Sequence, residues 1–149
     1  MKRFQFRLEK VKKVKESREK QKAQELARQM RALELENNRL QNLLKKRTEA
    51  FLELDEAQEG SLYSNEILTY CSYINMLNQD IEQQREKIFG IQQNIGRIQL
   101  ELLEASKGKK ILEKLREHQY LQYLLEGYRE EQKLLDEMSL ITRKFREML

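Results

Sequence analysis

The chain contains no proline and only 5 glycines among 149 residues, so very little in it interrupts a helix. Its apolar residues recur in steps of three and four, first from Leu26 to Leu54 and again from Leu77 to Leu112. This spacing lines one stripe of each helix with apolar side chains, as in coiled coils. It disfavours sandwiches, barrels and Rossmann folds, whose many connections need turn residues. The first predicted stripe comprises Leu26, Met30, Leu33, Asn37, Leu40, Leu44, Arg47, Phe51 and Leu54, and the second comprises Leu77, Ile81, Gln84, Ile88, Ile91, Ile95, Ile98, Leu102, Ala105, Lys109 and Leu112.

Glycine, serine and asparagine gather only in residues 59–66, so we place a turn at about residues 60–64. The first helix is predicted over about residues 4–59, with Gly60 as its left-handed cap, and the second over about residues 65–149. Folding the chain back there sets Leu44 opposite Ile81 and Leu54 opposite Cys71. Residues 122–149 are left without an intrachain partner. The prediction is a single all-α domain over residues 1–149, a long antiparallel two-helix coiled-coil hairpin with a C-terminal helical overhang.

Charge is distributed unevenly along the chain. Residues 1–31 hold 12 basic and 4 acidic side chains, whereas residues 48–84 hold 8 acidic side chains and no lysine or arginine. Such separation indicates two ends with different partners, because each end attracts surfaces of opposite charge. The longest uncharged stretch, residues 67–79, is too short and too polar to span a bilayer.

The residues predict neither catalysis nor a cofactor or metal site. The single cysteine, Cys71, and the single histidine, His118, make no metal site without further ligands, and one cysteine forms no intramolecular disulfide. A reducing, cytoplasmic setting is therefore the default expectation. Gly108-Lys109-Lys110 lacks the spacing of a phosphate-binding loop. A two-helix hairpin also encloses no catalytic pocket, so we expect no enzyme.

Both ends of the sequence carry a family resemblance. Phe4-x-Phe6-x-Leu8-Glu9-Lys10-Val11, followed by an unbroken charged helix, together with Gly108-Lys109-Lys110-Ile111-Leu112-Glu113-Lys114-Leu115 and the run from Arg129 to Glu137, resembles the FliJ family of flagellar export proteins. The length and hairpin plan are similar over the whole chain. The resemblance implies a component of the flagellar type III protein export apparatus, needed for motility and similar in shape to the coiled-coil stalk of the gamma subunit of rotary ATPases.

The resemblance also implies partners and a location. The open end of the hairpin would insert into the export ATPase hexamer and promote its assembly and activity, through Phe4, Phe6, Arg7, Leu8, Val11, Gln132, Lys133, Leu135 and Asp136. The surface near the turn would contact the cytoplasmic region of the transmembrane export gate, through Tyr73, Leu77, Asp80 and Gln84. Export chaperones would be further partners. The protein would be cytoplasmic and peripheral at the cell membrane, at the flagellar base.

Two other functions stay open at this point. A generic coiled-coil tether or scaffold would self-associate and have no effect on an ATPase. A nucleic-acid or membrane-surface binder would depend on the basic N-terminal residues, such as Lys12, Lys13 and Lys15. We expect no nucleic-acid partner, because Glu9, Glu16 and Glu19 interleave with these bases at helical pair spacing and stacking aromatics are confined to the extreme end.

Overall fold

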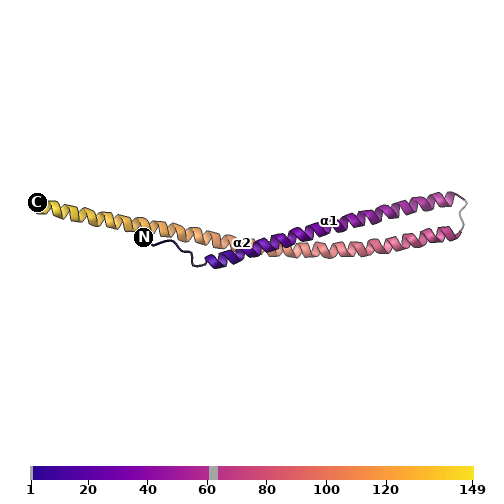
Figure 1. The fold of residues 1–149 in the computed structure, drawn as a ribbon, viewed down its shortest axis with the longest axis horizontal. Helices are drawn as coiled ribbons and strands as arrows, with labels where there is room; N and C mark the ends of the chain where they lie inside the picture. The colour runs from indigo at the N-terminus through magenta and orange to yellow at the C-terminus, as the bar shows by residue number, and fades with distance from the viewer. Residues whose placement is uncertain (1, 61–63) are drawn as a thin grey trace. The chain divides into compact units, whose positions relative to one another are not determined.

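The computed structural model describes residues 2–60 and 64–149, which form two α-helices (Figure 1). Helix α1 spans Glu9–Glu59 and helix α2 spans Ser64–Met148. The two helices run antiparallel, and the described residues contain no strand. The all-α fold of two long antiparallel helices, predicted from the apolar spacing, is therefore confirmed.

The helix ends differ in part from the expected bounds. Helix α1 begins at Glu9 rather than near residue 4, because residues 2–6 leave the helical path and the Glu9 N–H donates to the Phe6 carbonyl at 3.1 Å. Of the expected turn at residues 60–64, residues 61–63 lie outside the described part of the chain. The left-handed cap at Gly60 is wrong: Gly60 has no positive φ, and its N–H donates to the Glu56 carbonyl at 3.2 Å.

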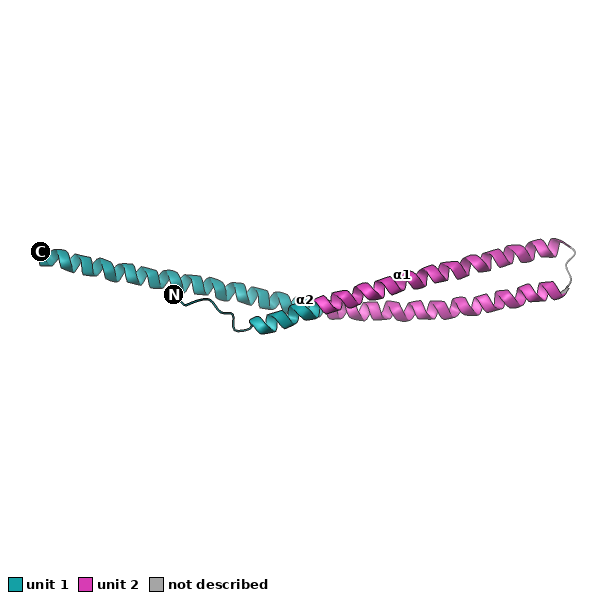
Figure 2. Cartoon of the chain, in the orientation of Figure 1, with its two compact units in different colours: residues 1–19, 103–149 teal, residues 20–102 magenta. Residues whose placement is uncertain are grey.

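The chain divides into two compact units (Figure 2). Unit 1 comprises residues 1–19 and 103–149, and unit 2 comprises residues 20–102. Each unit combines a piece of α1 with a piece of α2. The single domain expected over residues 1–149 stays a prediction.

In unit 2 the core lies along the stripe of α2 that the sequence predicts. Leu77, Ile81, Ile88, Ile95 and Ile98 are between 1% and 9% exposed. The expected antiparallel register also holds, because Arg47 Nη1 donates to Asn78 Oδ1 at 3.2 Å and Lys22 Nζ lies 2.6 Å from Glu101 Oε2. Both pairs join residues that the fold-back register sets side by side.

The buried stripe of α1 departs from the predicted one. Its buried residues are Glu36, Ala50 and Ala57, whereas Asn37 and Phe51, which were expected there, are exposed. Ala50 is only 2% exposed and packs with Ile74 and Leu77, so its small side chain leaves room for these larger residues. The four-and-three spacing of apolar residues selects Phe51 because Phe51 is larger and more apolar than its neighbour Ala50. The spacing therefore misses Ala50, which is the residue in the core.

In unit 1 the start of α1 pairs with the middle of α2. Glu9 Oε2 lies 3.5 Å from Arg116 Nε, and Glu19 Oε1 lies 3.5 Å from Lys109 Nζ. Further along α2, Gly127 is buried, and every residue after it is exposed. The predicted C-terminal overhang therefore begins after Gly127 in this unit.

Candidate functional site

The non-helical residues 2–8, which we call the N-terminal strap, hold an aromatic cluster against α2. The Phe4 ring lies 5.2 Å from the Tyr120 ring at an interplanar angle of 68°, and 5.4 Å from the Tyr123 ring. The Arg116 guanidinium carbon lies 5.8 Å from the Phe4 ring centroid, within cation–π range. The Tyr123 hydroxyl donates to the Lys2 carbonyl. Lys2 and Phe4 therefore tie the N-terminal part of the strap to one short stretch of α2.

A groove beside the strap has a basic lining with aromatic walls. Phe4 and Phe6 contribute apolar surface to it, and Glu9 is its one acidic side chain. The basic residues of the groove are Arg3, Arg7, Lys10, Lys13 and Arg116. Five cationic groups beside the half-buried Phe4 ring favour an anionic partner, because Coulomb attraction and some burial of apolar surface both contribute on contact.

The predicted ATPase-facing residues of the N-terminus all lie in unit 1, with one correction. Arg7 and Val11 are exposed and Leu8 is half-buried, as a contact surface requires. Phe6 is only 8% exposed, so it anchors the strap instead of presenting a free side chain. Phe4 is half-buried under the tyrosines.

The predicted ATPase-facing residues of the C-terminus belong to the same unit and are all exposed. Leu135 is 60% exposed, and Gln132 Nε2 donates to Asp136 Oδ1 at 3.3 Å along the helix. Lys133 lies between these residues and is also exposed. The two sets therefore belong to the same compact unit, and most of their members are exposed.

The predicted gate-facing residues near the turn, in unit 2, do not form one exposed surface. Tyr73 is 40% exposed, whereas Leu77 is 2% exposed and belongs to the core with Ala50 and Ile74. Leu77 therefore offers almost no exposed surface to a partner, and its role at the gate stays a prediction. Asp80 is half-buried, and Gln84 is bound to α1. Other exposed apolar side chains do occur in this acidic segment: Phe51, Leu52, Leu68 and Met76.

Gln84 takes part in a polar cluster inside the helix pair. Its Nε2 donates to the Glu36 backbone carbonyl at 2.9 Å and to Glu36 Oε2. Glu36 is 5% exposed, and its Oε1 lies 3.2 Å from Lys87 Nζ and 2.9 Å from Arg39 Nη1. The hydrogen bond from Gln84 lowers the pKa of the Glu36 carboxyl, against the opposing effect of burial, and Lys87 and Arg39 lower it further.

A second carboxyl of unit 2 is held in the same way. The hydrogen bond from Lys22 lowers the pKa of Glu101, Arg97 adds to this effect, and burial opposes it. The same hydrogen bond raises the pKa of Lys22. Polar residues thus hold the α1–α2 register at two separate layers. The sequence indicates neither pair, because apolar spacing says nothing about which charges face each other.

These shifts predict how stability depends on pH. The pKa values of Glu36 and Glu101 lie below the ordinary 4.5, so the unfolded chain binds more protons than the folded chain at acid pH. Their contribution to stability is present above pH 4.5 and is lost as pH falls below it. The raised pKa of Lys22 acts on the other side, where stability is lost as pH rises above 10.5. Urea unfolding between pH 7 and pH 3 measures the acid side.

The matched control for this prediction is the double variant Glu36→Gln with Glu101→Gln. Glutamine keeps an oxygen acceptor for Gln84 and Lys22 but carries no proton-dependent charge. We expect the variant to lose less stability than the parent chain between pH 5 and pH 3. Equal losses in the two proteins would contradict the assignment of acid sensitivity to these pairs.

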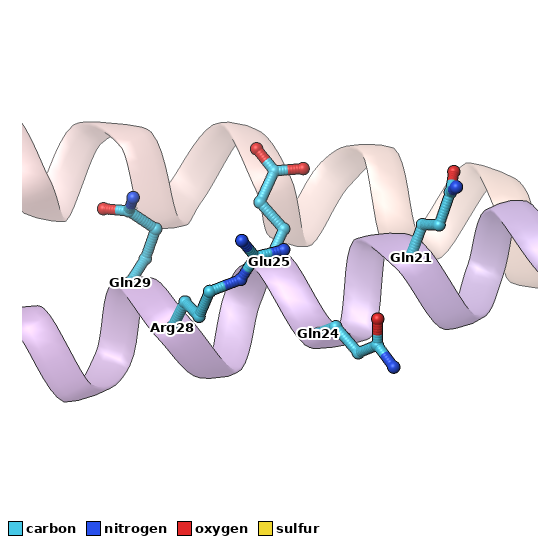
Figure 3. A pocket seen from close by; sticks show the side chains of 5 residues that line it. All are labelled: Gln21, Gln24, Glu25, Arg28 and Gln29. Atoms are coloured by element: carbon cyan, nitrogen blue, oxygen red, sulfur yellow. The ribbon is translucent and has the colours of Figure 1, made fainter.

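The other depressions of the surface suggest no chemistry. One of them is lined by Gln21, Gln24, Glu25, Arg28 and Gln29, all from α1, and Figure 3 shows Glu25 extending toward the second helix while Gln24 points away from it. Among the described residues, no three His, Cys, Asp or Glu side chains group as metal ligands. Cys71, expected opposite Leu54 in the helix pair, is exposed. No helix in the described residues is long and apolar enough to cross a membrane.

Apolar spacing does not indicate the groups on α2 that fix the strap. Tyr120 and Tyr123 are three residues apart, on neighbouring positions of one helix face, and Arg116 lies one turn before Tyr120. This spacing is visible in the sequence, and the structure gives its use, because the Phe4 ring packs against both tyrosines.

Comparison with known proteins gives a family and a fold. A family model described as "Flagellar FliJ protein" matches residues 4–146. A solved structure of a YscO homolog, CT670 of Chlamydia trachomatis, is 22% identical, with a TM-score of 0.58, over 98% of this chain and 99% of that one. This likeness supports the two-helix fold. No curated protein matches the sequence. With nearly its whole length matched by the family model, the chain belongs to the FliJ family, and it is a flagellar export component.

Proposed function

We propose that the chain is the non-enzymatic central stalk of the flagellar export ATPase, which enters the ATPase hexamer with the two chain ends of unit 1 and promotes its assembly and activity. Members of the family are in general non-enzymatic structural export components. The single observation that carries the proposal is the end of α2: every residue from Tyr128 to Leu149 is exposed, although apolar residues repeat there at helical spacing. Such a face favours burial against another protein.

The basic groove supports an electrostatic component of this contact. Arg3, Arg7 and Lys13 line it together with Phe4, so an acidic surface in the ring would be attracted before apolar surface is buried. Attraction between exposed charges weakens within a Debye length of about 8 Å at physiological salt. Assembly with the ATPase should therefore be faster and more complete at low salt.

The test is the hydrolysis rate of the cognate export ATPase with and without this protein, with sizing of the mixture at low and moderate salt. We expect stimulation together with a shift to a ring-sized species, and a smaller shift at the higher salt. No stimulation and no complex, from a chain that is helical by circular dichroism, would contradict the proposal. Self-association into long assemblies without any effect on hydrolysis would favour the tether instead.

The acidic segment near the helix junction suggests the second contact. Tyr73 is exposed there beside Met76, in a stretch of sequence without lysine or arginine, and such a surface suits a basic partner with an apolar pocket. We place the cytoplasmic region of the export gate on this surface, with Asp80 at its edge. The protein would then couple the ATPase to the gate at the cytoplasmic face of the membrane, at the flagellar base, and meet export chaperones there.

A further inference from the structure

The end of α2 carries a coiled-coil stripe of its own. Its positions follow steps of three and four: Tyr128, Glu131, Leu135, Met138, Thr142, Phe145 and Leu149, which we call the C-terminal face. The apolar members are 58% to 98% exposed, and the neighbouring Leu134 and Ile141 widen the face on one side. A stripe with this spacing fits a second helix with the same spacing.

The two polar members of the C-terminal face decide between the possible orientations. In a parallel pair each residue meets its own copy, so two Glu131 carboxylates would face each other and repel. In an antiparallel pair the alternate positions of the stripe meet. Leu135 then lies opposite Met138 of a second copy, Tyr128 opposite Phe145, and Glu131 opposite Thr142. The Thr142 hydroxyl donates to the Met138 carbonyl at 2.8 Å within the helix, and it would exchange that acceptor for the Glu131 carboxylate in such a pair.

Charge along the helix favours the same orientation. Residues 126–137 hold 5 acidic and 2 basic side chains, whereas residues 138–149 hold 3 basic and 1 acidic. Antiparallel pairing places the acidic half of one copy beside the basic half of the other, and parallel pairing places like charges together. The apolar stripe, its polar positions and the charge halves thus all match one register between two identical helices.

We propose that the C-terminal face is a self-association surface on which a second copy of this chain docks antiparallel. The dimer covers Leu135, which the proposed function gives to the ATPase. A chain in the dimer is therefore unable to enter the ring, and self-association lowers the amount of free protein that can bind the ATPase. Only this competition rests on the proposed function, because the dimer itself needs no other protein.

Sedimentation of the full-length chain over a range of concentrations tests the surface. We expect a species of twice the 18.1 kDa chain mass as concentration rises. Met138→Glu should weaken the dimer by at least about tenfold, because it buries a charge at the centre of the face. Leu140→Glu is the matched control, because Leu140 is as exposed as Met138, at 58%, but lies off the stripe. The dimer dissociation constant of this variant should stay within about twofold of the parent value. A monomer at all concentrations, or equal effects of both variants, would overturn the proposal.

Disulfide trapping tests the orientation. Two single-cysteine chains are prepared, Tyr128→Cys and Phe145→Cys, each in a chain that also carries Cys71→Ser. Each chain is oxidised alone, and a mixture of the two chains is oxidised in parallel. Antiparallel docking predicts a disulfide between the two different variants and little within either one alone. Disulfides within each variant alone would show parallel docking and overturn the register. A dimer that forms, with no ATPase stimulation even at concentrations where the chain is monomeric, would leave this inference standing and the stalk proposal refuted. A stimulating chain that stays monomeric at all concentrations would do the reverse.

Discussion

Leu77→Ala should lower the free energy of unfolding by about 2–5 kcal/mol, which is among the largest effects a single substitution can have here. Leu77 is 2% exposed and packs with Ala50 and Ile74, with Leu43 and Leu54 beside them. Truncation removes buried methyl groups, and it leaves a cavity that two helices close only in part. Urea unfolding followed by circular dichroism measures the change.

Tyr73→Ala is the matched comparison for Leu77→Ala, because Tyr73 was assigned to the same gate surface but is exposed. Tyr73 is 40% exposed, so its loss should change stability by less than about 1 kcal/mol. If it contacts the export gate, Tyr73→Ala should reduce gate binding and motility while ATPase stimulation is unchanged. Leu77→Ala should reduce every activity together, through stability. Equal stability of the two variants would show that Leu77 is not a core residue and would return it to the gate surface.

The distinction between these residues shows where sequence reasoning succeeds and where it stops. The spacing of Leu77, Ile81 and Ile88 predicted the buried stripe of α2, because large aliphatic side chains at steps of three and four have few other uses in a charged helix. The same Leu77 was also assigned to a surface through the family resemblance. On α2, burial follows from periodicity, whereas a functional role carried over from a family does not say which way a side chain points.

The misassigned positions of α1 have a different cause. Glu36 and Ala50 lie in the core, but neither looks like a core residue: one is charged and the other is small. Glu36 is tolerated because Gln84, Lys87 and Arg39 satisfy its carboxylate, and these partners come largely from the other helix. Its burial depends on the register between the helices, which a stripe count on α1 alone does not contain.

The strap was missed for a local reason. Residues 4–8 have no proline or glycine, so sequence patterns extend α1 through them, and tertiary contacts decide otherwise. Burial of Phe6 and the contacts of Phe4 with Tyr120 and Tyr123 compensate for the helical hydrogen bonds that are lost. The aromatic contact of Phe4 therefore makes the N-terminus part of a surface with α2 instead of one more helical turn.

Phe4→Ala combined with Leu8→Ala should weaken binding to the export ATPase by at least about tenfold and leave helix content unchanged. The Phe4 ring holds the strap on Tyr120 and Tyr123, and it forms a wall of the basic groove. Its loss removes an aromatic anchor and frees the strap, so binding must then order that segment again. Helix content stays the same because neither residue lies within α1, which begins at Glu9.

The matched control is Val14→Ala, which removes an exposed apolar side chain from the same unit without touching the strap. Val14 is 65% exposed and lies on α1, among the same basic residues. Titration of the ATPase with each variant at low salt, read by hydrolysis rate and by sizing, should give parent-like binding for Val14→Ala and weakened binding for the double variant.

Parent-like binding by both would show that the strap is a structural anchor and that the ring contact lies elsewhere, on the exposed end of α2. Equal weakening by both would instead show that contact depends on total apolar area at this end, because the strap would then contribute no more than any exposed aliphatic group. The ratio of the two affinities therefore measures how much of the ring contact the folded strap provides.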